Sequence, residues 1–345
     1  GEAGHAAAHR LAALSETRRK MGAGNPLAFA RVYLPHCLTA PSSSMHVEIC
    51  DLLVAVSMGR GRRVCVAAPR GSAKSMLVSL FYVLWSICYG RELYVTLISE
   101  TSAQAEQHLS HVKNELEGNP LLHADFPHAC EIPGRKPAPE RWRQDEILTR
   151  NGVMVTALGA AKRMRGRRNA QSRPTLVVLD DIESEQGVES AEQRAKLRSW
   201  FERTVLKAGD SGTNYLVLGT LLHHDSLLAS LVDPVRSPGW TGKVYRSVLS
   251  WADRQDLWAQ WEAIYSYRGT HEGTEGPDAA RKYFQANREE MLAGTRVLWP
   301  QKEDYYRLME RRLTEGAASF DSEMQNEPVS PDGCRPFDAG RDGIQ

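Results

Sequence analysis

Apolar runs alternate with helical segments along residues 64–249, and this alternation is the feature that most limits the fold. Expected strands, apolar nearly throughout, lie at 64–68, 93–99, 175–179, 214–218 and 244–249. Expected helices lie between them, at 74–88, 102–116, 191–207 and 225–232. Apolar strands separated by helices indicate an α/β fold with a mostly parallel sheet that helices cover on both faces. One hairpin is predicted over 147–158, with its turn at Asn151 and Gly152.

The two ends of the chain follow a different pattern. Helices are predicted at 5–21 and 46–58, whereas 26–44, with Pro35, Pro41 and three serines, reads mostly as loop. Strand signals stop after residue 250, and helical patterns continue to 326. We therefore expect four parts, which are an N-terminal helical segment (1–59), a sheet core (60–250), a small helical subdomain (251–327) and a linker (328–345).

Charge and cysteine content exclude several protein classes. The 43 basic and 42 acidic residues nearly cancel, which argues against a globally basic nucleic-acid coat protein. The longest apolar stretch, 77–89, is shorter than the about 20 residues that cross a bilayer, so no membrane partner is expected. None of the six cysteines forms a C-x-x-C pair, which argues against a zinc ribbon.

A candidate phosphate-binding loop follows the first expected strand. Residues 68–75 fit G-x-x-x-x-G-K-[ST] with alanine in both glycine positions, and an apolar helix follows. The loop N–H groups would cradle phosphates, Lys74 would contact the β- and γ-phosphates, and the Ser75 hydroxyl would ligate Mg²⁺. The expected cradle consists of Pro69, Arg70, Gly71, Ser72, Ala73, Lys74 and Ser75. The alternative is a plain strand–turn–helix with a surface lysine.

Two further strand ends carry polar side chains. The run 175–179 leads into Asp180, the candidate Mg²⁺ ligand. A second carboxylate would polarise the attacking water; Glu183 is favoured and Asp181 is the alternative. Thr220 follows the strand at 214–218 and could sense the γ-phosphate. Asp225 is expected to cap the next helix.

Basic residues gather in the segment 162–173, which contains no acid. An arginine there could stabilise charge on a transferring phosphate, or could neutralise DNA phosphates. Arg70 is a separate candidate that would act in cis. A solvated loop is the third interpretation.

The order of these motifs resembles the N-terminal ATPase region of the tailed-bacteriophage terminase large subunit. The likeness spans about residues 25–337. Near the N-terminus it rests on the segment from Tyr33 to His36, which precedes Pro41 and His46, and on the Walker A loop, in which Arg70 lies four residues before Lys74. Further along, it rests on residues 164–166 before the Walker B run 179–183. It also rests on residues 218–220 and on the end segment 320–328.

The resemblance implies an ASCE-type P-loop NTPase core with a C-terminal helical lid. It implies Mg²⁺-dependent ATP hydrolysis that drives double-stranded DNA into a procapsid. Arg70 would act in cis, and Arg165 or a neighbour in 163–168 would act in trans. Tyr33 and His46 would lie on the adenine side.

The resemblance also implies partners and a location. The partners would be double-stranded DNA, the portal protein, the small terminase subunit and further copies in a homo-oligomeric ring, expected as a pentamer. The site of action would be the host cytoplasm, at the portal vertex. The nuclease domain that normally follows is expected to be absent, so this chain should not cut DNA.

Two other functions fit parts of the pattern. Another P-loop NTPase, such as a helicase, would separate strands, although no further helicase motif is present. A non-hydrolysing DNA- or portal-binding module with a decayed P-loop would explain the two alanines in the glycine positions.

Overall fold

A seven-stranded, mostly parallel sheet organises the computed structural model, which describes residues 2–130, 141–161, 173–266 and 276–328. The strand order is β3-β4-β2-β5-β6-β1-β7, and every neighbouring pair runs parallel except β3 and β4. The strands are β1 (Arg63–Ala67), β2 (Tyr94–Ser99), β3 (Glu146–Leu148), β4 (Met154–Gly159), β5 (Leu176–Asp180), β6 (Asn214–Gly219) and β7 (Thr241–Val244). The predicted α/β class and the β3–β4 hairpin are confirmed.

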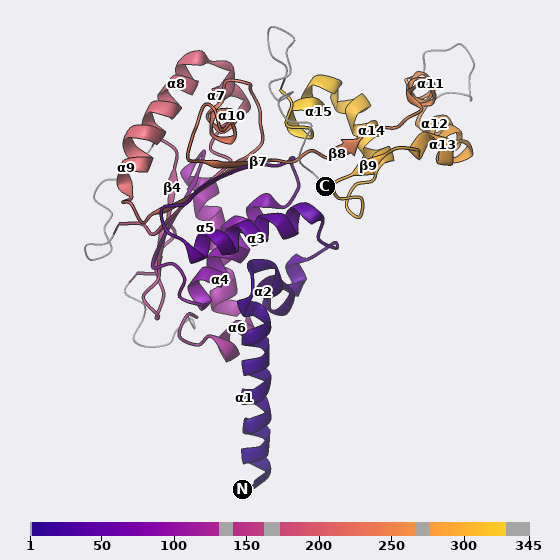
Figure 1. Cartoon of the computed structure of the whole chain (residues 1–345). Helices are drawn as coiled ribbons and strands as arrows, with labels where there is room; N and C mark the ends of the chain where they lie inside the picture. Colours follow the sequence, from indigo (N-terminus) through magenta and orange to yellow (C-terminus); the bar gives the residue numbers. More distant parts are fainter. Residues whose placement is uncertain (1, 131–140, 162–172, 267–275, 329–345) are drawn as a thin grey trace.

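Helices cover both faces of this sheet (Figure 1). One layer comprises α2 (Pro26–Tyr33), α3 (Ser44–Met58), the π-helix η2 (Met76–Tyr82), α4 (Val83–Cys88), α5 (Ser102–Gly118) and α6 (Pro120–Asp125). The opposite layer comprises α7 (Glu185–Glu189), α8 (Ala191–Trp200), the π-helix η3 (Phe201–Val205), α9 (Leu206–Ala208) and α10 (Leu227–Val232).

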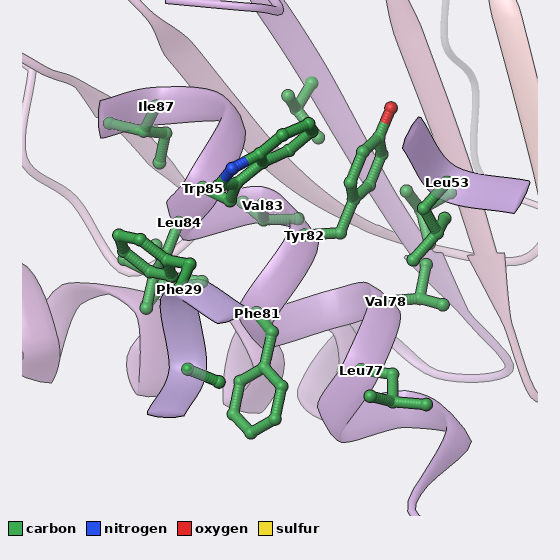
Figure 2. Close-up of a cluster of buried hydrophobic side chains, with 14 of the residues drawn as sticks. Phe29, Leu53, Leu77, Val78, Phe81, Tyr82, Val83, Leu84, Trp85 and Ile87 are labelled. Atoms are coloured by element: carbon green, nitrogen blue, oxygen red, sulfur yellow. The ribbon is translucent and has the colours of Figure 1, made fainter. Parts of the chain in front are cut away.

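The two layers form separate hydrophobic cores because successive strand residues point to opposite faces. In β1, Val64 and Val66 belong to the first core, whereas Cys65 and Ala67 belong to the second. Figure 2 shows the first core, where side chains of η2 and α4 pack beside Phe29 of α2. The helix that follows the candidate phosphate loop is therefore held by buried apolar contacts on the sheet.

A third core lies in the C-terminal part of the chain. It gathers apolar side chains between residues 248 and 324, including Trp258, Trp261 and Phe320. Its elements are β8 (Val248–Ser250), α11 (Gln255–Tyr265), α12 (Pro277–Ala286), α13 (Arg288–Leu292), β9 (Arg296–Val297), α14 (Tyr305–Glu315) and α15 (Ala317–Glu323). The strands β8 and β9 form a separate antiparallel pair.

Several local predictions were wrong. Residues 26–33 form helix α2 rather than loop, because Asn25 accepts a hydrogen bond from the Ala28 N–H and Pro26 occupies the first helical position. Helix α6 was not predicted from the sequence, and Asn119 caps its start by accepting the Leu121 and Leu122 N–H groups. The expected strand 244–249 divides into the end of β7 and the start of β8.

Helix α1 (Glu2–Ala23) extends away from the rest of the molecule (Figure 1). Its C-terminal part is attached by the Arg18–Asp125 ion pair and by a hydrogen bond from the Trp85 indole N–H to the Gly22 carbonyl. The short 3-10 helix η1 (Pro35–Cys37) follows α2. Within the described part of the chain, no helix is both long and apolar enough to span a membrane.

Candidate nucleotide site

Three parallel strands end at the same edge of the sheet and bring the predicted polar residues together. Strand β6 lies between β1 and β5, in keeping with the ASCE class that the resemblance implies. The Lys74 ammonium lies 3.3 Å from the Thr220 Oγ1 and 3.5 Å from an Asp181 carboxylate oxygen. Ligands of open α/β sheets bind at this edge, beyond the carboxyl ends of the strands.

One of the two alanines in the glycine positions of the loop, Ala73, has a left-handed backbone conformation. Ala73 has φ +63° and Gly71 has φ +73°, whereas Ala68 is not among the described residues with positive φ. Alanine therefore carries no left-handed penalty at position 68. At position 73 it adopts a conformation that costs an L-residue about 1–2 kcal/mol.

The loop also contains a buried cation and an orphaned hydroxyl. The Lys74 side chain is only 7% exposed, and its nearest carboxylate lies at 3.5 Å. The Ser72 hydroxyl is buried and has no hydrogen-bond partner among the described residues. A buried charge and a buried hydroxyl are costly unless they are paired. Both groups, beside a helix that begins at Lys74, fit an anionic ligand such as a phosphate.

Asp180, at the end of β5, is held by two serine hydroxyls from the helix after the loop. Ser75 donates to one carboxylate oxygen at 2.9 Å, and Ser79 donates to the other at 2.6 Å. The His108 Nε2 lies 3.6 Å from the same oxygen as Ser79. Burial and the neighbouring Asp181 raise the pKa of the Asp180 carboxyl, and His108 and the two serines oppose that rise. The two predicted Mg²⁺ ligands, Ser75 and Asp180, are thus in direct contact.

The two candidate water-polarising acids occupy different environments. The Asp181 side chain is 52% exposed and faces Lys74, and its backbone has φ +48°. The Glu183 carboxylate accepts hydrogen bonds from the Leu227 and Leu228 N–H groups at 2.7 and 2.9 Å, at the start of α10. Burial raises the pKa of Glu183, whereas these backbone bonds lower it. In this structure both oxygens of Glu183 anchor a helix.

Arg70 joins the loop to two other segments. Its guanidinium lies 2.9 Å from a Glu323 carboxylate oxygen and 3.5 Å from one of Glu185, and its backbone N–H donates to the Glu323 carbonyl. Lys302, also from the C-terminal part, donates to the Gly71 carbonyl at 2.6 Å. The loop therefore contacts the region that carries the third core.

His46 and Tyr33 lie in different places. The His46 Nδ1 accepts the Ser43 N–H at 2.8 Å, which leaves the proton on Nε2 to donate to the Ser72 carbonyl at 2.9 Å. His46 therefore supports the phosphate loop through the Ser72 carbonyl. The Tyr33 hydroxyl donates to Asp125 at 2.9 Å, beside α1, and Tyr33 is not among the described residues that line the cavities around the loop.

Two larger cavities flank the loop. One, of about 340 Å³, is lined by Arg70, Lys74, Asp181, Glu183 and Thr220 among others. The other, of about 500 Å³, lies between residues 69–72 and the segment that contains Trp299, Lys302 and Glu323. Arg70 lines both cavities. Together they give a ligand room on either side of the loop.

Sequence reasoning missed three residues of the site. Ser79 lies four residues after Ser75, a helical spacing that could have indicated a shared partner. His108 and Lys302 are distant in the sequence, and no pattern signals their approach. The predicted arginine Arg165 lies outside the described residues.

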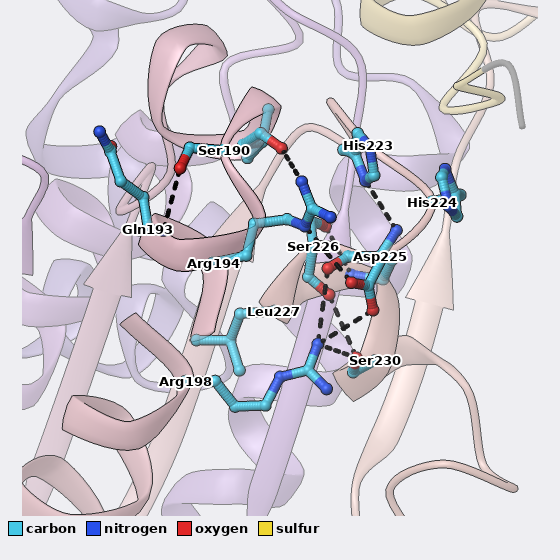
Figure 3. Close-up of polar contacts among 12 residues, drawn as sticks. Ser190, Gln193, Arg194, Arg198, His223, His224, Asp225, Ser226, Leu227 and Ser230 are labelled. Atoms are coloured by element: carbon cyan, nitrogen blue, oxygen red, sulfur yellow. Dashed lines mark hydrogen bonds and ion pairs between the residues drawn. The ribbon is translucent and has the colours of Figure 1, made fainter. Parts of the chain in front are cut away.

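The loop after Thr220 is fixed by an arginine cluster that sequence reasoning also missed (Figure 3). Asp225 does not cap α10 as predicted; Ser226 does, by accepting the Ala229 N–H. The Asp225 carboxylate instead pairs with Arg194, Arg198 and Arg236 at 3.1–3.4 Å. With Arg194 and Arg198 on α8, the segment between β6 and α10 is tied to that helix.

Comparisons with known proteins find solved structures that are similar at low identity and low TM-score. No family model and no curated protein matches the chain. Among solved structures, the large terminase ATPase domain of Thermus phage P74-26 is 15% identical, covering 80% of this chain and 92% of that one, with a TM-score of 0.36. An arginine-to-alanine mutant of that domain is 16% identical and covers 80% of this chain and 93% of its own, with the same TM-score.

Proposed function

We propose that this chain is a Mg²⁺-dependent ATPase domain of the terminase large-subunit kind. One observation carries the proposal: a nearly buried lysine meets Thr220 and Asp181 where β1, β6 and β5 end, beside the Ser75–Asp180 pair. This set supplies a phosphate-binding cation, a pair of oxygen donors for a hard divalent ion, and an accessible carboxylate.

The residues fit ATP and Mg²⁺ with defined roles. Lys74 and the N–H groups of Gly71 and residues 73–75 would hold the phosphates, and the Ser72 hydroxyl would gain the partner it lacks. Ser75 and Asp180 would hold Mg²⁺, whose bound charge offsets that of the phosphates during transfer. Ser79 and His108 hold the second Asp180 oxygen, which leaves the first oxygen beside Ser75.

Asp181 is the residue that we propose accepts hydrogen bonding from the attacking water. Its carboxylate is accessible and lies beside Lys74, whereas Glu183 is engaged by two backbone N–H groups. Thr220, in contact with Lys74, would register whether a terminal phosphate is present. Arg70 would exchange its carboxylate partners for the phosphate, since it lines the same cavity.

Nucleotide binding and hydrolysis by the parent chain and by Lys74→Ala test the proposal directly. We expect Mg²⁺-dependent turnover in the parent and loss of both binding and turnover in the variant. Lys196→Ala, which removes an exposed lysine paired with Glu192 on α8, is the matched control and should behave as the parent does. A parent chain that binds no nucleotide would refute the phosphate loop and favour the non-hydrolysing binding module.

The roles of the two acids separate in a second pair of variants. Asp181→Asn should retain nucleotide binding and lose hydrolysis by about 10²-fold or more, the lower end of what a positioned base contributes. Glu183→Gln should mainly destabilise the fold, by about 1–2 kcal/mol, because it weakens the anchor at the start of α10. Turnover rates and denaturation curves of both variants check this, and the reverse pattern would assign catalysis to Glu183.

The finer proposal is that hydrolysis drives translocation of double-stranded DNA into a procapsid. The motif order supports it, and the partners would be the portal protein, the small terminase subunit and neighbouring copies in a pentameric ring at the portal vertex in the host cytoplasm. Arg165, or a neighbour in 163–168, would act on the neighbouring copy. We expect the chain to displace a third strand from duplex DNA in an ATP-dependent manner and to leave a forked duplex paired. Unwinding of the fork would instead identify a helicase.

A further inference from the structure

Three metal-ligating side chains converge at a place remote in sequence from the phosphate loop. His36 and Cys37 lie on η1, and Glu115 lies near the end of α5. One nitrogen, one sulfur and one oxygen from these side chains all lie within 4.8 Å of one another. His36 Nε2 is 2.8 Å from a Glu115 carboxylate oxygen. Among the described residues, this is the one such cluster.

The orientation of Glu115 is set by a buried neighbour. Asn119 donates one hydrogen bond from its side-chain nitrogen to the second Glu115 oxygen at 2.7 Å and another to the Tyr33 carbonyl at 2.8 Å. The Asn119 Oδ1 accepts the Leu121 and Leu122 N–H groups at the start of α6. The side-chain nitrogen and oxygen of Asn119 are therefore both hydrogen-bonded. As a result, one Glu115 oxygen is held by Asn119 and the other faces His36. Such outer contacts are typical of carboxylates that ligate metals.

We propose that His36, Cys37 and Glu115 bind a divalent transition-metal ion, with Zn²⁺ as the best chemical match. Thiolate, imidazole and carboxylate are the three ligand types of zinc sites, whereas Mg²⁺ and Ca²⁺ select oxygen donors. Three protein ligands leave a fourth position for water. The His36 side chain is 56% exposed, so an ion can reach the cluster from solvent.

The site would fasten one segment beside the phosphate loop to the helical layer. Cys37, residues 38–40 and Ser42 line a small cavity of about 70 Å³ together with His46 and Ala73. A metal shared with Glu115 would tie the start of that segment to α5. The metal would hold this segment in place, and the proposal does not depend on the proposed ATPase activity.

Zn²⁺ binding to the nucleotide-free full chain, measured by competition with a chromophoric chelator, tests the proposal. We expect one high-affinity Zn²⁺ per chain, loss of that ion in Cys37→Ser, and at least 10-fold weaker binding in His36→Ala and in Glu115→Gln. Co²⁺ in place of Zn²⁺ should give a thiolate-to-cobalt absorption band in the parent that is absent from Cys37→Ser. Zn²⁺ should also slow alkylation of Cys37, followed on its peptide by mass spectrometry.

Matched variants separate a built site from other outcomes. His111→Ala removes an exposed histidine from the same helix and should bind Zn²⁺ as the parent does, as should Lys74→Ala. Cys37→His replaces one zinc ligand by another and should retain binding, which excludes misfolding as the cause of loss in Cys37→Ser. An ion that persists in Cys37→Ser, or the absence of a stoichiometric ion from the parent, would leave an adventitious ion only and overturn the proposal.

Discussion

Ala73 is a residue at which backbone strain and function meet. Its φ of +63° places an L-residue in the left-handed region. Ala73→Gly removes about 1–2 kcal/mol of strain but adds freedom to the unfolded chain worth about 0.4–1 kcal/mol. We therefore expect a stability equal to that of the parent or higher by about 1 kcal/mol in urea denaturation. Ala68→Gly, at a buried position outside the positive-φ set, is the control and should destabilise; an equal loss in both variants would contradict the interpretation.

His46 gives the chain a defined response to acid. Burial lowers the pKa of His46 below its usual value, the bond to Ser72 opposes this, and Lys302 adds to the lowering. The unfolded chain therefore binds the proton more tightly than the folded chain does. Stability from this group is present above the ordinary histidine pKa, near 6.5, and is lost as the pH falls below it.

His46→Gln tests this dependence. Glutamine keeps polar atoms near Ser43 and Ser72 without a titrating ring, so the free energy of unfolding should fall less between about pH 7 and pH 5 than it does in the parent. His9→Gln, at an exposed position on α1, serves as the control. Parallel profiles of parent and His46→Gln would show that His46 does not contribute to the acid response.

Helix α2 is an element that depends on one cap. Asn25 accepts the Ala28 N–H at 2.8 Å, and Pro26 follows it. Asn25→Ala should lower the free energy of unfolding by about 1 kcal/mol, whereas Asn25→Asp should preserve it. Denaturation of the two variants in parallel checks the expectation, and equal stability of Asn25→Ala and the parent would show that tertiary packing alone holds α2.

The same element shows how far the sequence could predict the structure. The apolar strands and the polar residues at their ends were predictable, because burial on both faces leaves a pattern in the sequence. Helix α2 was missed because prolines and serines further along the segment outweighed a capped start. The contacts of Asp180 with His108, and of Arg70 with Glu323, were unpredictable because they depend on how distant segments pack.

At the scale of the whole molecule, Arg70 couples the phosphate loop to the C-terminal part. Glu323→Gln would weaken the nearer of its two side-chain ion pairs, which at an exposed arginine is worth up to about 1 kcal/mol. If the proposed role holds, Arg70 becomes freer to turn toward phosphate, and the KM for ATP should fall by about two- to fivefold. Steady-state kinetics check this. Glu315→Gln, in the same cavity but paired with Arg311, should leave KM unchanged; a higher KM in Glu323→Gln would contradict the coupling.

The sheet order has a mechanical consequence. Strands β1 and β5 are separated by β6, so their axes are about 10 Å apart, a gap fixed by two rows of backbone hydrogen bonds. The sheet thus holds a fixed spacing between the strand that leads to Lys74 and the strand that ends at Asp180. The backbone hydrogen bonds resist any widening of this spacing when the bound ligand changes. We therefore expect movement that follows a change of ligand to occur in the segments attached to these strands, which are the phosphate loop, the segment after β6 and the C-terminal helices.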